Sequence, residues 1–185
     1  KVFDFICQNV PKNSQLQVSN SSAIRYLQLF DLDKSIQVFC NRGTSGIDGS
    51  TSTAIGAALA TNLPTILITG DISFLYDSNA LWNNYIPKNF KIILLNNSGG
   101  GIFRILPGHQ ETETFNRYFE TSHQLNASHL AKMYGFDYFE ANDEATLQQQ
   151  YKSFLNQNEK PSILEIFTPE KENNGILLEF FRGLK

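Results

Sequence analysis

One stretch decides the fold of this chain: Pro64-Thr65-Ile66-Leu67-Ile68-Thr69-Gly70-Asp71-Ile72-Ser73. Its first half is a short run of aliphatic and β-branched residues, which is typical of a strand buried on both faces of a parallel sheet. A Gly-Asp dipeptide follows this run directly. Because ligands bind in α/β sheets beyond the carboxyl ends of the strands, the stretch predicts a central strand that ends at a functional edge.

Outward from this stretch, similar apolar runs alternate with amphipathic segments along the chain. The further predicted strands are 35–39, 91–95, 136–140 and 162–168. The predicted helices are 21–30, 50–61, 78–85, 128–134 and 144–156. This alternation predicts an α/β fold, in which helices cover both faces of a parallel sheet. A length of 185 residues is enough for a single domain over 1–185.

Composition and charge narrow the classes of function. The net charge is -3, and no cluster of Lys and Arg provides the basic surface that nucleic acids or anionic membranes require. No apolar run is long enough to span a bilayer. Cys7 and Cys40 form neither a disulfide framework nor a zinc-binding spacing, which fits a cytoplasmic protein. The chain begins at Lys1 without an initiator Met, so we expect a piece of a longer protein.

Three polar loops follow predicted strands: Asn41–Gly49, Gly70–Ser73 and Asn96–Gly101. Asp71 and Asn97 are 26 positions apart (97 − 71), the length of one helix plus one strand, so their loops are expected on adjacent strands. A carboxylate, an amide oxygen and the Gly99 carbonyl are hard oxygen ligands that suit Mg²⁺ in a phosphate complex. The sequence therefore predicts a magnesium and phosphate site at this edge.

Plain structural roles compete with these interpretations. Gly-Asp and Asn-Asn are ordinary turn dipeptides when each is taken alone. Arg25 is expected to be a solvated side chain, with Ser21 as the N-cap of its helix, whereas for Arg42 the structural and functional interpretations are balanced. The three histidines have no metal-binding spacing and are expected at the surface or satisfied by neighbours, and the acidic residues near the middle are expected to be solvated. These residues are His109, His123, His129, Glu111, Glu113 and Glu120.

Together, the Gly-Asp and Asn-Asn loops resemble the cofactor motif of the thiamine-diphosphate enzymes, from Gly70 to Gly99. The flanking residues narrow the resemblance to one branch, the menaquinone-pathway synthases that make 2-succinyl-5-enolpyruvyl-6-hydroxy-3-cyclohexene-1-carboxylate. This match runs from about Val18 to Leu106 and depends on three segments. They are Asn41-Arg42-Gly43-Thr44-Ser45-Gly46-Ile47-Asp48-Gly49, Asp71-Ile72-Ser73-Phe74-Leu75-Tyr76-Asp77 and Asn96-Asn97-Ser98-Gly99-Gly100-Gly101-Ile102-Phe103.

The resemblance implies a role for each matching residue. Mg²⁺ is expected on Asp71, Asn97 and the Gly99 carbonyl. The thiamine diphosphate is expected to contact Ile47, which would support its bent form, together with Gly70, Asp71, Ile72, Ser73, Asn97, Gly99, Gly100 and Ile102. The substrates are expected at Ser21, Arg25, Arg42, Ile102, Phe103 and Leu106. Arg42 and Ile47 are the two residues for which a part in catalysis is implied.

The implied reaction decarboxylates 2-oxoglutarate on the cofactor and adds the succinyl unit to isochorismate, so the chain would be part of a transferase. The glutamate that activates the cofactor in this superfamily belongs to another domain, so the isolated chain is expected to be inactive. A homo-oligomer that includes the missing domains is also implied. The alternatives are an acetolactate-synthase-like decarboxylase or carboligase, a nucleotide-binding module, which lacks its usual motifs here, and a purely structural domain.

Overall fold

A computed structural model describes residues 1–105, 108 and 110–183 of the chain. Its centre is a six-stranded sheet with the order β2-β1-β3-β4-β6-β5, and every strand pair is parallel. The strands are β1 (Gln15–Val18), β2 (Gln37–Cys40), β3 (Thr65–Gly70), β4 (Lys91–Asn96), β5 (Asp137–Ala141) and β6 (Ser162–Phe167). The predicted α/β class with a parallel sheet is therefore confirmed.

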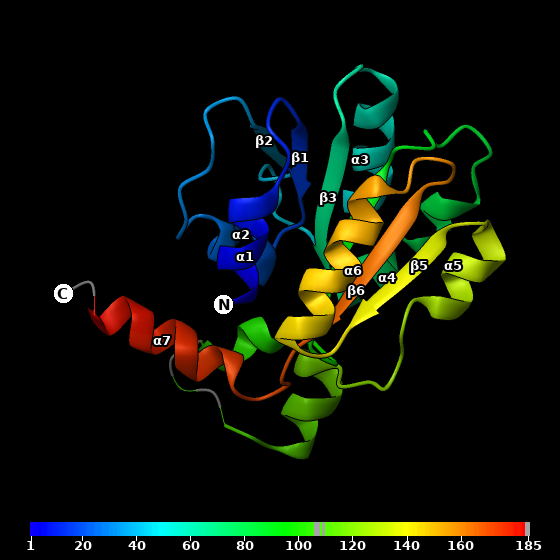
Figure 1. Cartoon of the computed structure of the whole chain (residues 1–185). Coiled ribbons are helices and arrows are strands. Elements are labelled where there is room, and N and C mark those ends of the chain that lie inside the picture. The colour runs from blue at the N-terminus through cyan, green and yellow to red at the C-terminus, as the bar shows by residue number, and fades with distance from the viewer. Residues whose placement is uncertain (106–107, 109, 184–185) are drawn as a thin grey trace.

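Helices cover both faces of this sheet, so the fold has three layers (Figure 1). One face packs against α1 (Val2–Asn9), α2 (Ser22–Leu27) and α6 (Glu144–Asn156), and the other against α3 (Ser50–Leu59), α4 (Asp71–Tyr76), α5 (Ser128–Tyr134) and the 3₁₀ helix η1 (Ser78–Trp82). Successive residues of a strand point to opposite faces. Ile66 and Ile68 accordingly lie in one core and Leu67 in the other, which is why the strand is apolar throughout.

Three further elements gather at the lower end of the sheet in Figure 1, where the strands end. They are the 3₁₀ helix η2 (Gly101–Ile105), the π-helix η3 (Phe115–Glu120) and α7 (Asn173–Gly183). The hydroxyl of Tyr26 on α2 donates to the carbonyl of Asn173 at 2.8 Å, which ties the start of α7 to the body of the domain. None of the helices formed by the described residues is long and apolar enough to cross a bilayer.

The structure corrects several expected elements. Strand β1 was not predicted because Gln15 and Gln17 make it look polar, although all four of its residues are buried. The helix expected at 78–85 is only the short η1, whereas α4 begins at Asp71 itself. The helix expected at 21–30 ends at Leu27, and the sequence reasoning did not identify α1 or α7.

Candidate functional site

Asp71 lies at the carboxyl end of β3, as the first residue of α4, and its residue surface is only 4% exposed. Its Oδ2 accepts hydrogen bonds from the backbone N–H groups of Asn97 at 3.2 Å and Gly99 at 2.9 Å. Its Oδ1 accepts from the N–H of Ile72 at 2.8 Å. Because β3 and β4 pair in parallel with Gly70 opposite Leu95, the two predicted loops do meet at one edge.

Burial governs the charge of this carboxyl group. It raises the pKa of Asp71, while the N–H of Ile72, the nearby His123 and the N–H groups of Gly99 and Asn97 act in the opposite direction. A buried carboxylate that lacks full compensation favours a cation beside it. Among the described residues no group of three or more His, Cys, Asp and Glu side chains could hold a metal ion. A cation here would therefore depend on Asn97 and a backbone carbonyl as well as Asp71, and all of these are oxygen donors of the kind that Mg²⁺ prefers.

The loop after β4 is shaped by close backbone contacts. Gly99 has φ +155°, and a Cβ atom at this position would lie 2.9 Å from the carbonyl oxygen of Glu120. The N–H of Gly100 donates to that same carbonyl at 2.6 Å, and the N–H of His123 donates to the carbonyl of Ser98 at 3.1 Å. Residues 120–123 therefore fold back against the loop, and only glycine fits at position 99.

A buried ion pair supports this folded-back segment. The guanidinium of Arg104 forms a two-bond ion pair with the carboxylate of Glu120, and the two side chains are 5% and 1% exposed. Arg104 also lies over the ring of Phe115, 5.7 Å from its centroid. The expectation that Glu120 is solvated was wrong, because the chain reverses after η2 and brings this carboxylate to the buried guanidinium of Arg104.

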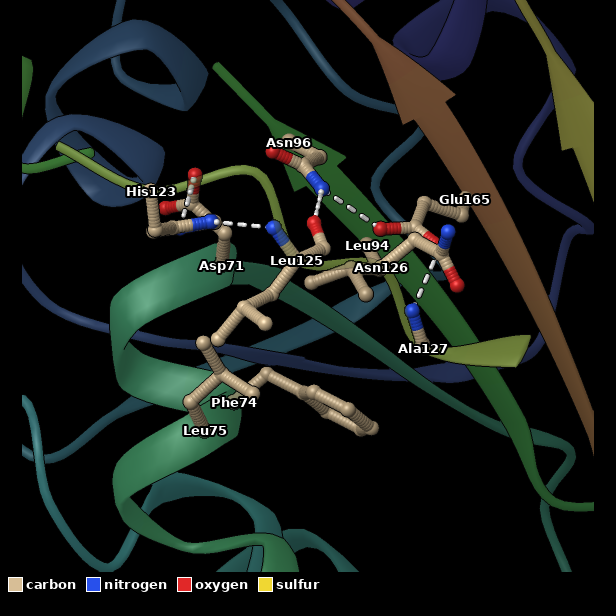
Figure 2. Close-up of a pocket in the computed structure, with 10 residues that line it drawn as sticks. All are labelled: Asp71, Phe74, Leu75, Leu94, Asn96, His123, Leu125, Asn126, Ala127 and Glu165. Atoms are coloured by element: carbon tan, nitrogen blue, oxygen red, sulfur yellow. Dashed lines mark hydrogen bonds and ion pairs between the residues drawn. The ribbon is translucent and has the colours of Figure 1, made fainter. Parts of the chain in front are cut away.

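His123 lies beside Asp71, although its spacing in the sequence gave no sign of a role (Figure 2). Its side chain is 11% exposed, and its Nε2 lies 3.3 Å from Asp71 Oδ2. Its Nδ1 accepts a hydrogen bond from the N–H of Leu125 at 3.0 Å. Sequence reasoning missed this residue because it lies 52 positions after Asp71 (123 − 71), and no periodic pattern connects the two.

The two asparagines at the end of β4, Asn96 and Asn97, have different surroundings. The side chain of Asn96 is turned into the small pocket of Figure 2, where it donates to Glu165 Oε1 at 2.7 Å and to the carbonyl of Leu125 at 2.9 Å. Glu165 is fully buried on β6 and also accepts from the N–H of Ala127 and the hydroxyl of Tyr138. Asn96 is thus committed to the core, and of the two asparagines it is Asn97 that is left at the edge for the predicted role.

The loop Asn41–Gly49 is held mainly by Asn20, a residue that sequence reasoning did not single out. Asn20 is 2% exposed, and its amide donates to the carbonyls of Asn41 at 2.7 Å and Gly46 at 2.6 Å. Arg42 Nη1 in turn donates to Asn20 Oδ1 at 2.9 Å. The signal that could have identified Asn20 is its position two residues after the end of β1, but that strand was itself not predicted.

Ser73 joins this loop to the Asp71 region. Its hydroxyl donates to the carbonyl of Ile47 at 2.5 Å, so α4 holds the loop that carries the residue expected beneath the cofactor. Gly70, Ile72 and Ile47 are half-buried around this contact. The structure therefore brings the cofactor-binding residues predicted on two different loops to one edge.

Ser21 and Arg25 lie at the start and on the outer side of α2. Ser21 has φ +68° and occupies the N-cap position, as expected. Its side chain makes no capping hydrogen bond, however, so it does not stabilise the helix as a capping serine would. Arg25 is exposed, as is Arg42 on the neighbouring loop. We refer to Ser21, Arg25 and Asn41–Gly49 as the Arg42 edge, and to Asp71, Asn97–Gly101 and 120–123 as the Asp71 edge.

The apolar residues predicted to line the pocket follow the glycine loop. Ile102 and Phe103 are half-buried in η2, and the ring of Phe103 makes an edge contact with Phe119 at a centroid distance of 5.9 Å. Gly100 is also half-buried, beside the carbonyl of Glu120. Leu106 lies outside the described residues.

Comparisons with known proteins agree with this geometry. The family model described as "Thiamine pyrophosphate enzyme, C-terminal TPP binding domain" matches residues 20–166, thiamine pyrophosphate being another name for thiamine diphosphate. Relatives named 2-succinyl-5-enolpyruvyl-6-hydroxy-3-cyclohexene-1-carboxylate synthase are 66% identical in Flavobacterium johnsoniae, 68% in Flavobacterium psychrophilum and 43% in Bacteroides fragilis. These alignments cover 97–100% of this chain but 33% of each relative, so the chain spans about one third of the length of those proteins. With 147 of its 185 residues (166 − 20 + 1) inside the family model, the chain belongs to the C-terminal thiamine-pyrophosphate-binding domain family of the thiamine pyrophosphate enzymes.

Proposed function

We propose that this chain is the diphosphate-binding and magnesium-binding domain of a 2-succinyl-5-enolpyruvyl-6-hydroxy-3-cyclohexene-1-carboxylate synthase. Asp71, Asn97 and the Gly99 carbonyl would hold Mg²⁺, and the turn Gly70–Ser73 would cradle the diphosphate. The observation that carries this proposal is the buried Asp71, whose Oδ2 is held by two N–H groups of the neighbouring loop. Its Oδ1 accepts only the local N–H of Ile72 among the hydrogen bonds found in the described residues, and so has room for a cation.

The remaining site residues have supporting roles in this proposal. Thiamine diphosphate, when bound, supplies the electron sink for decarboxylation of a 2-oxo acid and for formation of a carbon–carbon bond. Ile47 would support the cofactor from below, because the bond from Ser73 fixes the backbone of its loop. Gly100 and Ile102 would contact the cofactor, while Ile102, Phe103 and Leu106 would exclude water from the substrate.

The substrates we propose are 2-oxoglutarate and isochorismate, which together carry several carboxylates. Arg25 and Arg42 are exposed at the Arg42 edge, where planar guanidinium groups can bind carboxylates with two hydrogen bonds. Ser21 lies beside them at the start of α2. The printed names of relatives at 66% and 68% identity support this substrate pair over the acetolactate-type alternative.

We further propose that residues 1–185 form one domain at the C-terminal end of a longer cytoplasmic chain. The relatives are about three times as long as the aligned part, which leaves room for the domains that would complete the site. Those domains would supply the glutamate that activates the cofactor, and a homo-oligomer would bring them to the Asp71 edge. The single continuous sheet supports the assignment of one domain to this chain.

The test is calorimetric titration of thiamine diphosphate into the full-length protein that carries this chain, with and without Mg²⁺. Binding should require Mg²⁺, and Asp71→Ala should abolish it, since the only carboxylate ligand is removed. Asp31→Ala, at an exposed carboxylate, is the matched control and should bind like wild type. Thermal unfolding without cofactor checks that both variants are folded. Wild-type protein that ignores the cofactor at millimolar concentration would refute the proposal.

The substrate assignment needs its own measurement. Release of carbon dioxide from 2-oxoglutarate, with isochorismate as acceptor, should be far faster than release from pyruvate. Arg42→Gln should raise KM more than it lowers kcat for whichever of the two substrates it contacts. The reason is that the guanidinium would bind a carboxylate that takes no part in the reaction. Preference for pyruvate would instead favour the acetolactate-type carboligase.

A further inference from the structure

The contacts of Asp71 are unequally divided between its two oxygens. Oδ2 receives the N–H groups of Asn97 and Gly99, and His123 Nε2 lies 3.3 Å from the same atom. Oδ1 receives only the N–H of Ile72 among the hydrogen bonds that the described residues form. One oxygen is thus surrounded by protein donors, while the other is left for an external partner.

The protonation of the His123 ring follows from its other nitrogen. The N–H of Leu125 donates to Nδ1 at 3.0 Å, so Nδ1 is an acceptor and carries no proton. In the neutral ring the proton must then sit on Nε2, the nitrogen that faces Asp71. The backbone of Leu125 therefore selects the tautomer that presents an N–H donor to the carboxylate.

The position of His123 is fixed by the same loop that Asp71 holds. Its backbone N–H donates to the carbonyl of Ser98 at 3.1 Å, and its side chain is 11% exposed. Within the described part of the chain, Nε2 is a buried polar atom without an aligned hydrogen bond, although Asp71 Oδ2 is 3.3 Å away. A small rotation of the ring or the carboxylate would align this buried donor with Oδ2, and the resulting hydrogen bond would stabilise the folded protein.

We propose that His123 is a positioning residue for the metal ligand Asp71. Its Nε2–H holds Oδ2 in place, so that Oδ1 faces the cation, and the N–H of Leu125 keeps the imidazole in the required tautomer. This inference rests on the proposed function, because it assigns a partner to the carboxylate that binds Mg²⁺. Residues that orient a metal ligand typically contribute about 10- to 100-fold to metal affinity.

The competing role is simple packing. His123 lines the small pocket of Figure 2 together with the apolar side chains of Phe74, Leu75 and Leu125. A packing residue would be sensitive to the size of its replacement, whereas a positioning residue is sensitive to the place of the N–H donor. Two amide replacements separate these roles, because the amide of glutamine superimposes on Nε2 of histidine and that of asparagine superimposes on Nδ1.

The experiment titrates Mg²⁺ into the full-length protein at a fixed concentration of thiamine diphosphate and measures cofactor binding by calorimetry. We expect His123→Asn to weaken the apparent Mg²⁺ affinity by about 10- to 100-fold. His123→Gln should remain close to wild type, because its amide reaches Oδ2. Thermal unfolding without metal or cofactor shows whether either variant is damaged in its fold.

Four results would overturn the inference. Equal losses in His123→Gln and His123→Asn would point to packing, and unchanged affinity in both would remove any role in positioning. A nitrogen-15 spectrum of the metal-free protein with labelled histidine gives an independent readout, in which a proton on Nδ1 of His123 would contradict the assigned tautomer. If wild type itself shows no Mg²⁺-dependent binding while the tautomer is as expected, the proposed function fails first, and the inference falls with it.

Discussion

The Asp71 edge and the Arg42 edge lie side by side at the ends of the strands, but they are built differently. At the Asp71 edge the charged groups are buried and have partners: backbone N–H groups hold Asp71, and Glu120 pairs with Arg104 of the adjoining η2. At the Arg42 edge the cationic side chains are exposed, and one buried residue, Asn20, holds most of the loop. The charged groups of the Asp71 edge are therefore satisfied within the chain, whereas the cationic side chains of the Arg42 edge are left facing outward.

The largest effect that would test this contrast is expected from Glu120→Ala. The change leaves the guanidinium of Arg104 buried without its two-bond partner, which typically costs about 3–5 kcal/mol. Glu111→Ala removes an exposed carboxylate 3.5 Å from the same guanidinium and should change stability far less. Denaturant unfolding of the two variants measures the difference, and equal losses would mean that the Asp71 edge is not built around a buried pair.

A smaller loss is expected from Gly99→Ala. The new Cβ would meet the Glu120 carbonyl at 2.9 Å in a backbone conformation that alanine rarely adopts, at a cost of about 1–3 kcal/mol. The matched control is Gly43→Ala at the Arg42 edge, where a Cβ atom meets nothing within 4 Å and the change should be within about 0.5 kcal/mol. Thermal unfolding of both variants measures the loss of stability. A larger loss in Gly43→Ala than in Gly99→Ala would contradict the contrast.

Asn20→Ala tests the single buried support of the Arg42 edge. Loss of its amide frees two loop carbonyls, one of them on the exposed Asn41, so water can replace much of the bonding and the cost should be about 1 kcal/mol. Limited proteolysis should cut the loop 41–49 faster in this variant than in wild type. Asn158→Ala, at an exposed amide, is the control, and equal cleavage rates in the two variants would show that Asn20 does not hold the loop.

The smallest effect is expected in the rates at which the two cysteines are chemically labelled. Burial raises the pKa of Cys7 to about 11 and also raises the pKa of Cys40, but Cys40 is only half-buried, beside Asn20. Because the thiolate is the reactive form, both thiols should react slowly with iodoacetamide near pH 8, and Cys40 should react first. Mass spectrometry of wild type and Cys40→Ser follows the order of labelling. Faster labelling of Cys7 would mean that its helix opens more readily than the Arg42 edge.

Sequence reasoning succeeded where one residue type and its neighbours decide the local structure. The apolar runs around Ile66 and Ile92 could be assigned to strands, and the loops after them carry Asp71 and Asn97 at adjacent ends, as expected. It failed where long-range contacts decide. The polar strand at Gln15 is recognisable only once its neighbours in the sheet are known, because its glutamines are buried against them.

The same limit explains the missed site residues. Glu120 and His123 look like surface residues in the sequence, and they reach the Asp71 edge only because the chain turns back after η2. No periodic pattern or short motif records that reversal. Asn20 was missed for a related reason, since its importance depends on the end of a strand that the sequence does not reveal.

The reversal after η2 also bears on how this protein can change over evolutionary time. The hydrogen bonds from Gly100 to Glu120 and from His123 to Ser98 fasten both ends of the intervening segment together. For a loop fastened at its ends, doubling the length costs only about 0.6 kcal/mol of chain entropy. Insertions at the exposed residues 110–112, which lie between η2 and η3, should therefore accumulate among related proteins without shifting the carboxylate of Asp71, and engineered sequences could be inserted at the same place.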